Sequence, residues 1–268
     1  MIDMTSAPTL GVAVDLDLRE IGDEATRTHL RALYAEHHLL RFKDQSLTIE
    51  QQIAVMELFG EVLKQRKDAV GFITNEAVKE NFLGASELAF HSDLAFSPKP
   101  YHGISLHAVQ VDNGRTSTRY IDSADAYDRL PAALKEEVEG LEALHVFGAN
   151  LAGRNLSDTP DHLPRQVHPL VWRHPKTGRK ILYVSYNQTA SIVGYDKARS
   201  DDLIERLFEY SYPPHAIYDH RWYIGDVVIW DNIAMQHARG DISEVGVRRL
   251  QRAVIGEAGF FEQYPEFE

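Results

Sequence analysis

The chain has 268 residues, of which 44% are hydrophobic and 25% are charged, so it is long enough to bury a sizeable core. Its 40 acidic and 28 basic residues give a net charge of −12, which argues against non-specific binding to nucleic acids. It has no cysteine, which excludes disulfides, thiolate metal sites and a cysteine nucleophile.

The first residues of the chain carry acidic groups and lack the apolar core of a signal peptide. No stretch approaches the 18 uncharged apolar residues that a membrane-spanning helix needs. We therefore expect a cytoplasmic protein with no membrane segment, and the sequence leaves the formation of a homo-oligomer open.

Residues 10–18 alternate between apolar and polar side chains, which predicts a strand. The pattern of residues 23–42 predicts a helix that runs into a strand, and Asp23 is the expected N-cap of the helix. Three of its apolar residues fall on one helical face: Leu30, Leu33 and Tyr34.

A second helix is predicted from a capping-box pattern, in which Thr48 precedes Gln51 by three residues. The apolar residues that follow fit helical spacing only loosely. Gly60 is the expected end of this helix, because glycine is common just after helix ends.

After residue 80 the pattern changes to short segments rich in β-branched and aromatic residues and bounded by turn residues. These segments are residues 101–110, 119–122, 180–185, 226–230 and 248–256. Two helical stretches interrupt them, at 122–141, where Pro131 stands near the start of a second helix, and at 201–212. We found no repeat and no linker, so the sequence predicts one domain, 1–268, with a mostly antiparallel β core and helices outside it. Separated strands at this length suit a jelly roll or a barrel.

The stretch AFHSDLAF places His91 and Asp93 two positions apart within an apolar run. On a strand, residues i and i+2 project to the same face, so the two side chains would enter one pocket. An imidazole and a carboxylate form half of a first-row metal site, and a second histidine would complete the facial triad of non-haem iron oxygenases.

The second histidine must come from elsewhere among the 13 in the chain. Several have ordinary explanations in loops or at strand edges: His37, His38, His162, His168 and His174. His237 differs, because it follows a predicted strand and a turn in GDVVIWDNIAMQHARGD. In a jelly roll a late strand can lie beside an early one, so His237 is the candidate partner of His91 and Asp93.

Three motifs occur in the order of a known family: HSD at 91–93, GDVVIWDNIAMQH at 225–237 and RRLQR at 248–252. Together they resemble the taurine dioxygenase / 2,4-dichlorophenoxyacetate dioxygenase family of Fe(II)- and 2-oxoglutarate-dependent oxygenases. The likeness extends over nearly the whole chain. It implies a double-stranded β-helix (jelly roll) with flanking helices.

The resemblance implies a role for each matching position. His91, Asp93 and His237 correspond to the three iron ligands of the family. Thr118 corresponds to a threonine that hydrogen-bonds the distal carboxylate of 2-oxoglutarate, and Arg248, 11 residues after His237, corresponds to the arginine that binds the same carboxylate. The implied cofactors are Fe(II), 2-oxoglutarate as cosubstrate, and O₂.

Two further positions concern the substrate. Arg252 corresponds to a pocket arginine that meets the anionic end of taurine in the taurine enzyme. Glu87 stands where that enzyme has a polar amide, and Phe90 stands where the family usually has tryptophan. A carboxylate at Glu87 would favour a cationic or hydroxylated group, so taurine itself is doubtful. The pocket wall is expected from loops at 64–90 and 146–170.

The alternation of the last strand gives independent support for the arginines. Arg248, Leu250 and Arg252 share one face. If that face points inward, two guanidinium groups are buried, and they must find anions there. A bidentate carboxylate would satisfy one of them.

The implied reaction is hydroxylation of a C–H bond in a small polar molecule, coupled to conversion of 2-oxoglutarate into succinate and CO₂. A zinc-dependent hydrolase is an alternative, because two histidines and an aspartate also suit Zn²⁺, although it would not need two inward arginines. A non-catalytic metal-binding jelly roll is another. A serine hydrolase is not favoured, because no G-x-S-x-G motif is present.

Overall fold

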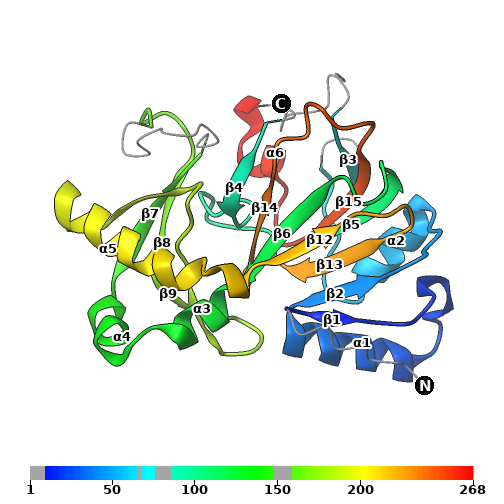
Figure 1. The fold of residues 1–268 in the computed structure, drawn as a ribbon, viewed down its shortest axis with the longest axis horizontal. Helices are drawn as coiled ribbons and strands as arrows, with labels where there is room; N and C mark the ends of the chain where they lie inside the picture. Colours follow the sequence, from blue (N-terminus) through cyan, green and yellow to red (C-terminus); the bar gives the residue numbers. More distant parts are fainter. Residues whose placement is uncertain (1–9, 66–67, 76–85, 148–158, 268) are drawn as a thin grey trace.

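The computed structural model describes residues 10–65, 68–75, 86–147 and 159–267. Its largest element is a six-stranded sheet in which every neighbouring pair is antiparallel except β1 and β2 (Figure 1). In sheet order its strands are β1 (Val12–Ala13), β2 (Leu39–Phe42), β13 (Val227–Asp231), β5 (Gly103–Gln110), β15 (Arg249–Ile255) and β3 (Val70–Thr74).

A four-stranded antiparallel sheet packs against one face of the six-stranded sheet. In order its strands are β12 (Tyr218–Arg221), β6 (Ser117–Asp122), β14 (Met235–Arg239) and β4 (Leu88–His91). The two sheets share one apolar cluster, in which Tyr120 and Met235 from the smaller sheet meet Leu106, Trp230 and Leu250 from the larger one. The predominantly β architecture with flanking helices agrees with the prediction.

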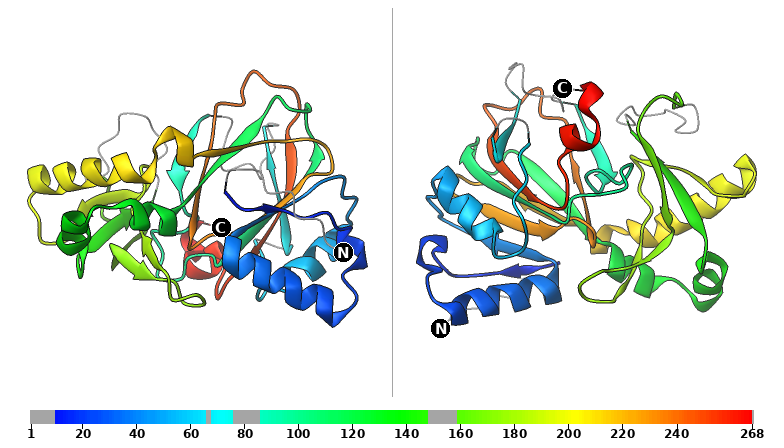
Figure 2. Two further views of the ribbon diagram at one scale, coloured as in Figure 1. Left: turned by 60° about the horizontal axis from the view of Figure 1, so that its bottom comes forward. Right: turned by 180° about the vertical axis from the view of Figure 1, so that it is seen from behind.

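Two N-terminal helices, α1 (Glu24–His37) and α2 (Ile49–Met56), cover the other face of the six-stranded sheet (Figure 2). The predicted caps are confirmed: the Asp23 side chain accepts a hydrogen bond from the backbone N–H of Thr26, and Thr48 and Gln51 form a capping box. The predicted helix face is confirmed as well, because Leu30, Leu33 and Tyr34 are its buried residues.

Two predicted boundaries in this region are wrong. The strand expected over 10–18 is reduced to Val12–Ala13, because the Gln45 side chain bonds the backbone N–H of Leu18 and the carbonyl of Leu16. These contacts divert the chain into a turn of 3₁₀ helix, Leu18–Glu20. The second helix ends at Met56 rather than at Gly60.

A second group of elements lies at the opposite end of the molecule from α1 and α2 (Figure 1). It contains a three-stranded sheet, a hairpin and three helices, namely β11 (Thr189–Ile192), β7 (Glu142–Val146), β8 (Arg165–Pro169), β10 (Lys180–Leu182), β9 (Val171–Arg173), α3 (Ser123–Arg129), α4 (Ala132–Val138) and α5 (Lys197–Ser211). Pro131 occupies the N-cap position of α4, which confirms its predicted place near the start of a second helix. The helix expected at 201–212 begins earlier, because Asp196 is its N-cap.

The chain finishes with a short helix, α6 (Phe260–Gln263), and a 3₁₀ turn, Pro265–Phe267. Another 3₁₀ turn, Pro214–Ala216, precedes β12. Among the described residues, no helix has the length and apolar character that crossing a bilayer would require.

Candidate metal centre

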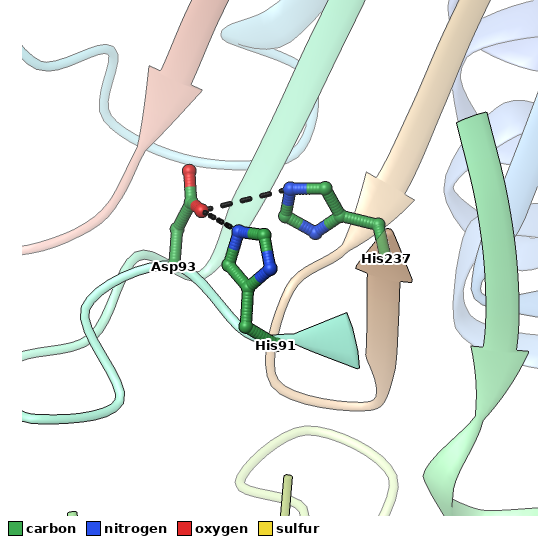
Figure 3. Close-up of side chains that lie close together, drawn as sticks. All are labelled: His91, Asp93 and His237. Carbon is green, nitrogen blue, oxygen red and sulfur yellow. Dashed lines mark ion pairs between the residues drawn. The ribbon is translucent and has the colours of Figure 1, made fainter. Parts of the chain in front are cut away.

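The side chains of His91, Asp93 and His237 converge between β4 and β14 (Figure 3). His91 ends β4 and pairs directly with His237 on β14, so their imidazole centroids are 4.3 Å apart. Asp93 Oδ1 lies 3.2 Å from His91 Nε2 and 3.6 Å from His237 Nε2. Within the described part of the chain, this is the one group of three histidine or acidic side chains that could hold a metal ion.

The sequence predicted that strand alternation would bring His91 and Asp93 to one face. This prediction is wrong for Asp93. The strand β4 ends at His91, so Asp93 lies in the following turn rather than on the same strand face. Asn232, which is fully buried, holds that turn. Its Oδ1 accepts from the Asp93 N–H at 2.8 Å, and its Nδ2 donates to the carbonyls of Asp93 and Tyr101, at 2.9 Å each. Leu94 then adopts a left-handed φ of 61°.

Arg252 orients the Asp93 carboxylate. Its Nη2 donates to Asp93 Oδ2, which leaves Oδ1 facing the two imidazoles, and its Nη1 donates to Gln65 Oε1. Burial opposes ionisation of Asp93, but the charge of Arg252, followed by the hydrogen bond with His91, outweighs it and holds the pKa of the carboxyl below its usual value. Asp93 is therefore a carboxylate at neutral pH.

Both histidines turn a ring nitrogen toward Asp93. His91 Nδ1 lies 2.7 Å from the Ala89 carbonyl, so it carries a ring hydrogen, and the other ring nitrogen, Nε2, faces Asp93 Oδ1. Burial, and then the nearby His91, lower the pKa of His237 to about 3. Two imidazoles and one carboxylate fit a divalent first-row metal with open coordination positions.

A buried arginine and a threonine line the same pocket as the three metal-ligand candidates. Arg248 immediately precedes β15 and is 1% exposed. Its Nη2 lies 3.5 Å from Thr118 Oγ1 on β6, and its Nε and Nη1 have no hydrogen-bond partner among the described residues. Burial, and then the charge of Arg239, lower the pKa of Arg248 to about 9, which leaves the group charged at neutral pH.

Arg239 is a pocket residue that the sequence reasoning missed. It stands two positions after His237 on β14. Because residues i and i+2 of a strand share a face, strand alternation could have predicted that Arg239 lies on the same side as His237. Its Nη2 donates to the Ser86 carbonyl at 2.7 Å, and burial lowers its pKa to about 10. Arg252 also lines the pocket, as the inward face of the last strand predicts.

Glu87 and Phe90 are not brought into this pocket. The Glu87 side chain is 65% exposed and forms an ion pair with Arg119 at 3.1 Å. Phe90 stacks on Tyr212, with ring centroids 4.9 Å apart. A substrate contact by Glu87 therefore stays a prediction that this geometry does not support. Of the loops expected to form the pocket wall, residues 66–67, 76–85 and 148–158 lie outside the described residues.

Two packed β-sheets that enclose a His-Asp-His cluster and a buried arginine are typical of the non-haem oxygenase class. The family model described as "Taurine catabolism dioxygenase TauD, TfdA family" matches residues 4–254. The chain therefore belongs to the TauD/TfdA family and is a 2-oxoglutarate-dependent dioxygenase.

Curated relatives agree with this assignment. The chain is 32% identical over 238 residues to the (S)-phenoxypropionate/alpha-ketoglutarate-dioxygenase of Sphingobium herbicidovorans, covering 80% of each chain. It is 30% identical to the alpha-ketoglutarate-dependent 2,4-dichlorophenoxyacetate dioxygenase of Cupriavidus pinatubonensis, covering 89% of this chain and 91% of the relative.

Solved structures resemble the whole chain. A putative alpha-ketoglutarate-dependent taurine dioxygenase from Burkholderia xenovorans superposes with a TM-score of 0.81 at 26% identity, covering 97% of this chain and 91% of that one. A protein called AAD-2, in complex with Mn(II) and N-oxalylglycine, gives a TM-score of 0.81 at 26% identity and covers 96% of this chain and 98% of that one.

Proposed function

We propose that this chain is an Fe(II)- and 2-oxoglutarate-dependent hydroxylase of a small organic anion. The chain would form one domain, 1–268, built on a double-stranded β-helix (jelly roll). The mixed contacts between the parts support one domain: Gln236 on β14 donates to Ser123 at the start of α3 and to the carbonyl of Val184. The pairing of an early strand, β4, with a late one, β14, supports the jelly roll.

In this proposal His91, Asp93 and His237 hold Fe(II) through His91 Nε2, Asp93 Oδ1 and an imidazole nitrogen of His237. The ion with its cosubstrate supplies the activation of O₂, in which one oxygen atom enters succinate as CO₂ leaves and the other hydroxylates a substrate C–H bond. The chain's own contribution is to keep the ligands in their binding forms. Arg252 keeps Asp93 ionised and turned toward the histidines, and the Ala89 carbonyl fixes the tautomer of His91.

The observation that carries the proposal is the state of Arg248. A guanidinium that is 1% exposed and has two nitrogens without a partner among the described residues is costly, because an uncompensated buried charge costs about 3–5 kcal/mol. A carboxylate that accepts from Nη1 on the end face of the guanidinium, beside Nη2, would remove much of that cost. The distal carboxylate of 2-oxoglutarate fits this requirement, with the Thr118 hydroxyl beside it. A zinc-dependent hydrolase or a non-catalytic jelly roll would not need this arginine.

The charge of the pocket suggests the class of substrate. Its described lining residues include the guanidiniums of Arg248 and Arg252, against the carboxylate of Asp93. After one anionic cosubstrate and a dication have bound, this surplus still favours a negatively charged group, and Arg252 would be its partner. The substrates named for the curated relatives, phenoxypropionate and 2,4-dichlorophenoxyacetate, are carboxylates.

The test is a panel of carboxylates, sulfonates, amines and alcohols added anaerobically to enzyme that holds Fe(II) and 2-oxoglutarate. A molecule that enters the pocket next to the metal perturbs the visible charge-transfer band of the complex. Anions should be over-represented among the molecules that do so and that are then hydroxylated when O₂ is admitted. Turnover of any member of the panel without 2-oxoglutarate would instead support a hydrolase.

A further inference from the structure

The indole of Trp222 is hydrogen-bonded to Thr118 behind the proposed cosubstrate site. Trp222 is fully buried and follows β12, and its Nε1 lies 2.9 Å from Thr118 Oγ1. An indole N–H can only donate, so the threonine oxygen accepts in this contact. The direction of the hydrogen bond is therefore fixed by the chemistry of the pair.

This contact restricts what the Thr118 hydroxyl can do next. A hydroxyl group has two acceptor lone pairs and one hydrogen. Trp222 occupies one lone pair, and the long approach of Arg248 Nη2, at 3.5 Å, is directed at the other. The phenol of Tyr120, two residues along the same strand face, makes no full hydrogen bond among the described residues, and its interaction with Thr118 is the smallest of the influences on its pKa. The threonine hydrogen can therefore turn toward another acceptor. The hydrogen of the Thr118 hydroxyl is thus the part that remains available to a ligand.

The backbone holds Trp222 firmly in place. Its N–H donates to the Thr116 carbonyl at 2.9 Å, and its carbonyl accepts from the Gly114 N–H at 2.8 Å. Both partners lie in the segment that leads into β6, the strand that carries Thr118. The ring of Trp222 also meets the His220 ring edge to face, with centroids 4.5 Å apart. The donor and its acceptor are thus parts of one rigid unit.

We propose that Trp222 is a positioning residue for the cosubstrate. The indole N–H of Trp222 donates to Thr118 Oγ1, so the threonine hydroxyl is left to act as a donor. Its O–H then points to the distal carboxylate that Arg248 binds. The inference rests on the proposed function, in which that carboxylate belongs to 2-oxoglutarate. It assigns the affinity for the cosubstrate partly to a residue that does not touch it.

The test compares two ligands by isothermal titration calorimetry with the Mn(II)-loaded enzyme, so that no turnover is needed. Trp222→Phe keeps the apolar packing and removes the donor. We expect it to weaken 2-oxoglutarate about tenfold, which corresponds to roughly 1.4 kcal/mol. The affinity for 2-oxopentanoate, which has the same chain length but no distal carboxylate, should change less than twofold. Trp172→Phe, a half-buried indole on β9 that stacks on His168, should change neither affinity.

A double-mutant cycle separates positioning from packing. Thr118→Val should lower the affinity for 2-oxoglutarate. Adding Trp222→Phe to this variant should lower the affinity no further, because the hydroxyl that mediates the effect is already gone. Additive losses, or equal losses for the two ligands, would overturn the inference. If the phenylalanine variant does not fold, 3-benzothienylalanine at position 222 keeps the indole shape without the N–H.

The cycle also distinguishes this inference from the proposed function. A Thr118→Val variant that binds 2-oxoglutarate normally would refute the role of Thr118, and this inference with it. A Thr118→Val variant that is impaired, together with a Trp222→Phe variant that is not, would refute the role of Trp222 alone.

Discussion

Replacing Arg248 should raise stability and destroy cosubstrate affinity at the same time. In the ligand-free protein this guanidinium is 1% exposed and has two unpaired nitrogens among the described residues, so Arg248→Met removes a desolvated charge and keeps much of the volume. A gain of about 1 kcal/mol would raise Tm by about 2–4 °C for a chain of this size. The loss of a buried partner for the carboxylate costs about 3–5 kcal/mol, or roughly two to three and a half orders of magnitude in affinity.

The assay is a thermal melt with and without 2-oxoglutarate, with Mn(II) present throughout. The unmodified enzyme should gain about 2.7 kcal/mol at a ligand concentration of 100 Kd, whereas Arg248→Met should start from a higher Tm and gain almost nothing. Arg249→Met is the matched control, because the neighbouring Arg249 is exposed and lies over the Phe72 ring at 4.1 Å. A variant that is destabilised and still shifted by 2-oxoglutarate would refute the assignment of Arg248.

Three further outcomes are expected. His91→Ala should lose its affinity for Mn(II) by calorimetry and keep its circular dichroism spectrum; unchanged metal affinity would remove His91 from the ligand set. Asn232→Ala should weaken Mn(II) binding about tenfold and lower the free energy of unfolding by about 2–3 kcal/mol, because it deletes three hydrogen bonds of a buried side chain that hold Asp93 and Tyr101. Glu87→Gln should leave the steady-state KM of a prime substrate within twofold, since the side chain is exposed, and a larger change would restore its predicted contact with substrate.

Much of the architecture could be predicted because its signals are local. The N-cap of α1, its buried face and the capping box of α2 each depend on residues within one or two helical turns. Boundaries that depend on distant partners were missed. The strand predicted over 10–18 is cut short by the Gln45 side chain, and nothing within that segment indicates the contact.

In the candidate site, too, local motifs could be predicted, whereas contacts between distant parts of the chain could not. His91, Asp93 and His237 could be selected from motif order, and the structure brings them together, but Asp93 reaches the site through a turn rather than through strand alternation. The clamp that holds it comes from Asn232, 139 residues away. The bond from Trp222 to Thr118 likewise requires the packing of a segment 104 residues further along the chain, which no spacing reveals.

The His91–Asp93–His237 site is proposed to couple O₂ to the breakdown of 2-oxoglutarate. The most direct measurement is mass spectrometry of the succinate formed from 2-oxoglutarate under ¹⁸O₂ with Fe(II), which needs no prime substrate because slow uncoupled turnover suffices. Succinate should carry one ¹⁸O atom, and Asp93→Asn should form almost none. Unlabelled succinate, or labelled succinate formed equally well by Asp93→Asn, would contradict the account.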